Sequence, residues 1–68
     1  MKHVWINGTS RSVPASTATV VELLAELGVP PQGTLVELNG VALFARDFAT
    51  TPVGEGDRVE LVRIAAGG

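Results

Sequence analysis

Residues 19–31, TVVELLAELGVPP, carry the clearest structural signal in the sequence. Thr19 and Glu22 have the spacing of a capping box, in which the hydroxyl accepts from the amide of residue 22 and the carboxylate accepts from the amide of residue 19. Four apolar residues recur at helical spacing and form one stripe: Val20, Leu23, Leu24 and Leu27. Gly28 can adopt the left-handed conformation that ends a helix, and the prolines after Val29 block its continuation. The stretch predicts a short amphipathic helix with both ends marked.

Two stretches before the helix predict a β-hairpin. Residues 2–7, KHVWIN, alternate between two faces, with Val4 and Ile6 on the same one. The Asn-Gly pair at 7–8 favours a type I′ turn, because both of its positions need positive φ. Residues 9–13, TSRSV, can return as a second, more polar strand.

Two more strands are expected directly after the helix. Residues 34–40, TLVELNG, alternate again, with Val36 and Leu38 facing inward, and they end in a second Asn-Gly turn. VALF at 41–44 follows as a short strand. Residues 45–53, ARDFATTPV, have no clean period, so we expect a loop or a single helical turn there.

The closing stretch, GEGDRVELVRI at 54–64, is a glycine-rich acidic turn followed by a strand with Val59 and Leu61 inward. The expected order is therefore β-β-α-β-β-β. One helix of this length can cover only one face of a mixed sheet, and as a crossover it can bring the last strand beside the first. We predict an α+β fold that forms a single domain over 1–68, with a flexible tail over 65–68.

Composition excludes several classes of protein. The chain has 68 residues and a formal net charge of −2, and a chain this short buries only about 60% of its unfolded surface. Without cysteine it has no disulfide, thiolate metal site or nucleophilic thiol. No apolar run approaches the roughly 20 residues of a membrane helix, and the N-terminal one is too short for a signal peptide. The five basic residues are scattered among seven acidic ones. We expect a cytoplasmic protein that binds neither membrane nor nucleic acid.

Patterns typical of catalytic or metal sites are absent from the sequence. His3 is the one histidine, and no neighbour in sequence would tune it; the serines of the first half have no general base at a suggestive spacing. Glu55 and Asp57 flank Gly56, but no run of oxygen ligands resembles a calcium loop. Asp57 is expected to accept backbone amides in its turn. We predict no catalytic residue, no metal ligand and no bound cofactor.

The last strand is expected to leave apolar side chains on the outer face of the sheet. If Val59 and Leu61 point into the core, Val62 and Ile64 point the other way, and Trp5 is on the outer side of its own strand. If the first and last strands are neighbours, these three form one exposed apolar patch, which usually marks a partner surface. The alternative is that the end of a small sheet curls over them. We predict that Trp5, Val62 and Ile64 contribute to partner docking.

The chain closes with Ala65-Ala66-Gly67-Gly68, whose side chains shrink towards the carboxylate. Two residues without Cβ can adopt backbone angles closed to others and can pass through a narrow channel. No side chain then crowds the terminal acyl carbon. An enzyme that must reach in and activate this carbon needs these properties, although a glycine pair taken alone is also typical of a frayed end.

Together these motifs resemble the small β-grasp sulfur-carrier proteins of the ThiS/MoaD type, which are relatives of ubiquitin. The resemblance covers essentially the whole chain and is carried by TVVELLAELGV (19–29), LVELNGVAL (35–43) and EGDRVELVRIAAGG (55–68). The last two are most similar to ThiS, the sulfur carrier of thiamine biosynthesis. Many ThiS sequences have a Pro-Arg pair and a tryptophan where FARDFA (44–49) stands, and a glycine in place of Ala66. The resemblance implies a ubiquitin-like β-grasp fold.

The resemblance also implies a carrier that performs no catalysis of its own. A ThiF-type adenylating enzyme would use ATP and magnesium to convert the Gly68 carboxylate into an acyl-adenylate. A persulfide sulfur, from a donor such as a cysteine desulfurase, would displace AMP and leave a thiocarboxylate. A ThiG-type thiazole synthase would accept this sulfur for the thiazole ring of thiamine. Gly68 would be the adenylation site, and Gly67 and Ala66 would thread into the partner enzyme.

Three alternatives stay open at this point. The same chemistry can serve another pathway, as the small subunit of molybdopterin synthase or as another thiocarboxylate sulfur carrier; co-purification with an acceptor enzyme would separate these. A ubiquitin-like modifier would instead be joined through Gly68 to lysines of other proteins, and isopeptide-linked adducts would reveal it. A plain β-grasp binding module would bind its partner equally well without the tail.

Overall fold

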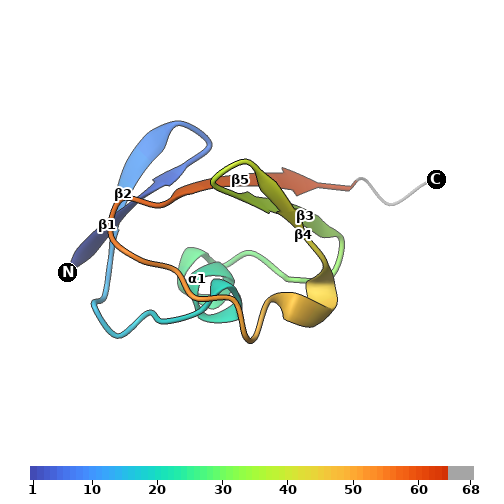
Figure 1. Ribbon diagram of the computed structural model, residues 1–68, viewed down its shortest axis with the longest axis horizontal. Coiled ribbons are helices and arrows are strands. Elements are labelled where there is room, and N and C mark those ends of the chain that lie inside the picture. The colour runs from blue at the N-terminus through green and yellow to red at the C-terminus, as the bar shows by residue number, and fades with distance from the viewer. Residues whose placement is uncertain (65–68) are drawn as a thin grey trace.

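In the part of the chain that the structure describes, a five-stranded mixed sheet packs one of its faces against one α-helix (Figure 1). The computed structural model describes residues 1–64, and the predicted tail over 65–68 lies outside them. The elements along the chain are β1 (Lys2–Ile6), β2 (Thr9–Val13), α1 (Val20–Leu27), β3 (Thr34–Leu38), β4 (Val41–Leu43), the 3₁₀ helix η1 (Ala45–Asp47) and β5 (Arg58–Arg63). The predicted order β-β-α-β-β-β is confirmed.

The last strand of the chain lies in the middle of the sheet. The strands are arranged in the order β2-β1-β5-β3-β4, with β5 parallel to β1 and antiparallel to β3. The prediction that the first and last strands are neighbours is therefore confirmed. Along β3, the pairing runs from Thr34 opposite Arg63 to Leu38 opposite Val59. The C-terminal end of β5 consequently leaves the sheet beside the start of β3 (Figure 1).

The hydrophobic core lies between α1 and the sheet. The inward faces predicted from alternation are correct, because Val36 and Val59 are buried and Leu38 and Leu61 pack against the core. Leu27, at the end of the helical stripe, is partly buried. The buried apolar residues of this core are Val4, Val13, Val20, Leu23, Leu24, Val36, Phe48, Val53 and Val59.

Both ends of α1 lie where the sequence predicts them. The Thr19 hydroxyl accepts from the amide of Glu22 at 3.3 Å, as in a capping box. The Glu22 carboxylate accepts from the Thr19 hydroxyl at 3.0 Å, whereas the pattern predicts the Thr19 amide as its donor. At the other end Gly28 has φ +72°, and Val29 N donates to Leu24 O at 2.9 Å. Among residues 1–64, no helix is long and apolar enough to cross a membrane.

The irregular segment after β4 completes the N-terminal cap of the helix. It contains η1, which confirms the predicted loop or single helical turn. Phe48 enters the core, and its carbonyl accepts from Val21 N at 3.0 Å. The carbonyl of Thr51 accepts from Val20 N at 2.9 Å. These two amides belong to the first turn of the helix, where no intrahelical acceptor exists. The segment therefore fixes the helix to the sheet by hydrogen bonds as well as by packing.

Two asparagines in the tight turns tie those turns to β5. Asn7 and Asn39 both have φ +50°, as the predicted Asn-Gly turns require. Asn7 Oδ1 accepts from Leu61 N at 2.8 Å. Asn39 Oδ1 accepts from Arg58 N at 2.9 Å, and its Nδ2 donates to Asp57 Oδ1 at 3.1 Å. Both turns therefore help to hold the central strand in register.

Candidate functional site

The candidate site is built around the end of β5, where the C-terminal segment begins. The sequence-predicted residues Ala66, Gly67 and Gly68 lie outside the described residues. Ile64 is the last described residue, and its amide donates to Gly33 O at 2.7 Å. This bond fixes the point from which the four following residues start.

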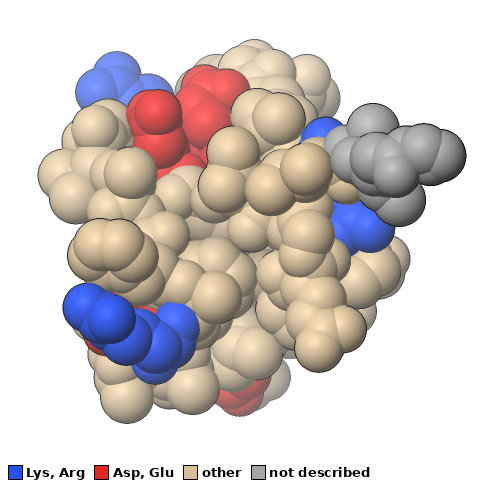
Figure 2. Space-filling model, turned by 90° about the vertical axis from the view of Figure 1, so that its right-hand side faces the viewer, with Lys and Arg blue, Asp and Glu red and all other residues tan. Residues whose placement is uncertain are grey.

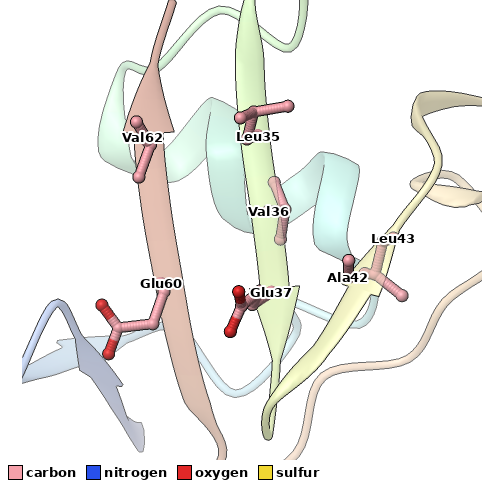
Figure 3. Close-up of a pocket in the computed structure, with 7 residues that line it drawn as sticks. All are labelled: Leu35, Val36, Glu37, Ala42, Leu43, Glu60 and Val62. Atoms are coloured by element: carbon pink, nitrogen blue, oxygen red, sulfur yellow. The ribbon is translucent and has the colours of Figure 1, made fainter.

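The outer face of the sheet is apolar next to this point. Val62 is 57% exposed and lies directly opposite Leu35, which is 56% exposed. Together with Ala42 on β4 they form what we call the outer patch: Leu35, Ala42 and Val62. These residues line a shallow groove over β5, β3 and β4, seen in Figure 3 with α1 behind the sheet. Ile64, which is 55% exposed, follows two residues after Val62.

Trp5 lies apart from the outer patch. It is 45% exposed, but it pairs with Arg58 at the start of β5. Glu60 separates Arg58 from Val62 on the outer face of the strand, because alternate residues share a face. All three predicted docking residues are exposed, yet the structure brings only Val62 and Ile64 together. Leu35 takes the place that was expected for Trp5.

Sequence reasoning missed Leu35, although a signal for it was present. Alternation in 34–38 places Val36 inward and therefore turns Leu35 outward. That Leu35 faces Val62 follows only from the β3–β5 register, which the sequence does not specify.

Two carboxylates border the outer patch. Glu37 on β3 lies directly opposite Glu60 on β5, and both are among the residues that line the groove in Figure 3. Like charges in directly opposite positions repel one another. Figure 2 shows the end of the molecule at which β5 stops. The surface there is largely uncharged, with charged side chains around its margin.

The other side chains that could take part in catalysis or metal binding make structural contacts instead. Asp57 Oδ2 accepts from Gly54 N at 2.7 Å, which confirms the prediction that it accepts a backbone amide in its turn. His3 Nδ1 lies 3.8 Å from Glu55 Oε2, and both side chains are well exposed. Within residues 1–64, no group of three or more histidine and carboxylate side chains is placed to hold a metal ion.

Comparison with known proteins identifies the family. The model of the ThiS family matches residues 4–68, which is nearly the whole chain. The chain belongs to the ThiS family. The resemblance predicted from the sequence motifs is therefore confirmed, and the chain is a ThiS-type sulfur carrier of thiamine biosynthesis.

Relatives in the ThiS family match this chain over nearly their full length. The sulfur carrier protein ThiS of Thermus thermophilus is 38% identical over 65 residues, which are 96% of this chain and 98% of that protein. A second relative is the thiamine biosynthesis protein ThiS from Geobacter metallireducens, whose crystal structure superimposes with a TM-score of 0.81 at 35% identity. The superposition covers 97% of this chain and 99% of that one. The predicted β-grasp fold is thus confirmed.

One further relative is much longer. The thiazole synthase of Paramagnetospirillum magneticum is 40% identical over 63 residues, which are 93% of this chain but only 19% of that protein. A ThiS-like region is therefore part of the same polypeptide as the rest of that thiazole synthase.

Proposed function

We propose that this ThiS-family chain carries sulfur as a thiocarboxylate on Gly68. The family match supports this most directly, because it extends through residue 68 and so includes the Gly67-Gly68 pair. The fold supports it as well, since the central strand β5 ends at Arg63 on the rim of the sheet, opposite the start of β3. Of the groups that react, the chain contributes only the Gly68 carboxylate.

The proposed chemistry takes place on a ThiF-type adenylating enzyme that uses ATP and magnesium. A carboxylate oxygen of Gly68 attacks the α-phosphorus of ATP, and pyrophosphate leaves. AMP is then a good leaving group, so the terminal sulfur of a persulfide on a donor such as a cysteine desulfurase displaces it at the acyl carbon. A thiol finally attacks the resulting S–S bond, which leaves the sulfur on Gly68 and the donor in a disulfide.

Small side chains near Gly68 suit this reaction. Gly67 and Ala66 let the segment enter a narrow channel that ends at the ATP, because glycine has no Cβ and alanine has nothing beyond it. Bulk at either position would prevent the acyl carbon from reaching the α-phosphorus.

We assign the docking of the adenylating enzyme to the outer patch. Four residues follow Ile64, and they span at most about 14 Å when fully extended. The enzyme that activates Gly68 must therefore approach the carrier close to Ile64. Val62 and Leu35 lie beside this point and are exposed and apolar. Trp5 lies about 20 Å along β5 from Ile64, so its predicted part in docking requires a wider interface.

The proposed acceptor of the sulfur is a ThiG-type thiazole synthase. The thiazole synthase of P. magneticum supports this assignment, because it contains a ThiS-like region in its own chain. Joining two partners in one polypeptide raises their effective concentration without any new contact.

The direct test is the intact mass of the protein after incubation with ATP, magnesium, a ThiF-type enzyme and a sulfur source. The expected result is the mass increase for one oxygen replaced by sulfur, located in the C-terminal peptide. An unchanged mass, with the same enzyme active on its own carrier, would contradict the proposal. Isopeptide-linked adducts formed instead would favour the ubiquitin-like modifier.

Val62→Asp is expected to weaken binding of the adenylating enzyme at least about tenfold, because a carboxylate in an apolar contact must lose its water on binding. The free energy of unfolding should fall by less than about 1 kcal/mol, since the side chain is exposed on a strand. Titration calorimetry and urea unfolding measure the two effects.

Val41→Asp is the matched control for Val62→Asp. Val41 is also exposed, at 62%, but it lies beside the Asn39-Gly40 turn, at the end of the sheet away from Ile64. Its substitution should leave binding unchanged. Equal binding by both variants would contradict the assignment of the outer patch, and an unfolded Val62→Asp protein would contradict its outward orientation.

A further inference from the structure

We infer that Arg63 positions the C-terminal segment for activation, a role that rests on the proposed function. Arg63 is the last residue of β5 and pairs with Thr34 at the start of β3. Because consecutive residues of a strand alternate between faces, the Arg63 side chain lies on the other face of the sheet from Val62, and hence away from the outer patch. Arg63 is thus placed to act on the segment without taking part in docking.

The guanidinium of Arg63 binds the loop that precedes β3. Its Nη1 donates to Gln32 O at 2.6 Å, to Thr34 Oγ1 at 2.8 Å and, more weakly, to Pro30 O at 3.3 Å. Thr34 Oγ1 in turn donates to Pro30 O at 2.6 Å, and Thr34 is buried. We call this set of contacts, with the backbone bond from Ile64 N to Gly33 O, the Arg63 clamp.

The loop is shaped to receive the guanidinium. Gly33 has φ +74°, a conformation that glycine adopts without strain, and a Cβ built on it would lie 3.5 Å from Arg63 Nη1. The backbone therefore passes directly beside the guanidinium with its carbonyls turned towards it. Hydrogen bonds from a charged donor to carbonyls are stronger than those between neutral groups.

The clamp matters because the terminal pair of a strand is the first to open. Local opening is easiest at element ends with few buried apolar contacts, and Arg63 and Ile64 are both exposed. If the Thr34–Arg63 pair opens, the segment starts from a variable point instead of a fixed one. Gly68 would then sample a larger volume and be held less often in line with the α-phosphorus.

Arg63→Ala is therefore expected to lower kcat for pyrophosphate release about tenfold, because the Gly68 carboxylate is less often aligned with the α-phosphorus. The Kd for the adenylating enzyme should change less than about twofold. Arg63→Lys should restore most of the rate. All three acceptors are reached by one nitrogen, and an ammonium group carries three N–H donors that can take its place. Arg58→Ala removes the same charge from the other end of β5 and should keep the wild-type kcat.

Hydrogen exchange of the Ile64 amide, measured by NMR on the chain alone, tests the clamp without any activity. Exchange at Ile64 should become faster in Arg63→Ala, whereas the core amide of Val59 should be unaffected. Unchanged exchange at Ile64 would overturn the clamp.

The two measurements together separate the possible failures. Faster exchange with a wild-type kcat would overturn the positioning role, and so would a raised Kd with an unchanged kcat, which would make Arg63 a docking residue. A wild-type chain that is never charged, while Ile64 exchange responds as expected, would overturn the proposed function and leave the contacts of the clamp established.

Discussion

Thiocarboxylate formation is expected to be lost completely in Gly67→Trp and in a chain without Gly68, with no change in stability. An indole at residue 67 cannot pass a channel that fits glycine, and deletion of Gly68 withdraws the carboxylate by about 3.5 Å. The buried apolar core extends only from Val4 to Val59, so neither change removes a core contact. Intact mass after the charging reaction measures the first effect, and thermal unfolding measures the second.

Ala66→Gly is the matched control for the two tail variants. It makes the tail smaller and should be charged at least as well as the wild type, because a smaller side chain enters a narrow channel more easily. Charging of Gly67→Trp at the wild-type rate would contradict the threading of the tail. Charging of the chain without Gly68 at that rate would place the reactive carboxylate elsewhere.

Leu24→Ala is expected to have the largest effect on stability. Leu24 is fully buried where α1 packs on the sheet, and replacing such a leucine by alanine costs about 2–5 kcal/mol. A chain of 68 residues has a free energy of unfolding of only about 3–10 kcal/mol, and this one contains no cysteine for a stabilising disulfide. The variant should therefore melt at least about 10 °C lower or be largely unfolded at 25 °C. Circular dichroism during heating and urea titration measures this.

Leu35→Ala provides the comparison for Leu24→Ala, because the same atoms are removed from an exposed position. It should change the free energy of unfolding by less than about 1 kcal/mol. It should also weaken binding of the adenylating enzyme, because Leu35 belongs to the outer patch. Equal stability of the two variants would mean that the division of the sheet into a core face and an outer face is wrong.

The sequence predicts those parts of the fold that are specified by near neighbours. The capping residue Thr19, the apolar stripe and Gly28 lie within ten residues of one another, and they define the helix without tertiary information. Strand faces follow from alternation, and the Asn-Gly pairs place both tight turns. Even here the prediction fails in one detail, because the Glu22 carboxylate accepts from the Thr19 hydroxyl and not from the Thr19 amide. Which of two close donors a side chain binds is decided only in the folded structure.

Contacts between segments that are distant in sequence cannot be predicted from such local patterns. The register of β1 on β5 is not fixed by a short turn, so the separation of Trp5 from Val62 is not apparent in the sequence. The hydrogen bonds of Phe48 and Thr51 to the helix, and of Arg63 to the loop before β3, likewise join residues far apart in sequence. The importance of Gly68 was predicted by family resemblance, since a carboxylate has no distinctive pattern of its own.

The central place of β5 has a consequence for how the protein is made. Ribosomes synthesise this strand after the other four, yet it joins the β1–β2 hairpin to the β3–β4 hairpin. An isolated hairpin is marginally stable in water, so a nascent chain that stops before Arg58 cannot complete its core. Products of premature termination therefore stay unfolded and open to proteases. The folded molecules that an activating enzyme can meet are therefore those whose synthesis has passed β5, which directly precedes the segment proposed to carry the sulfur.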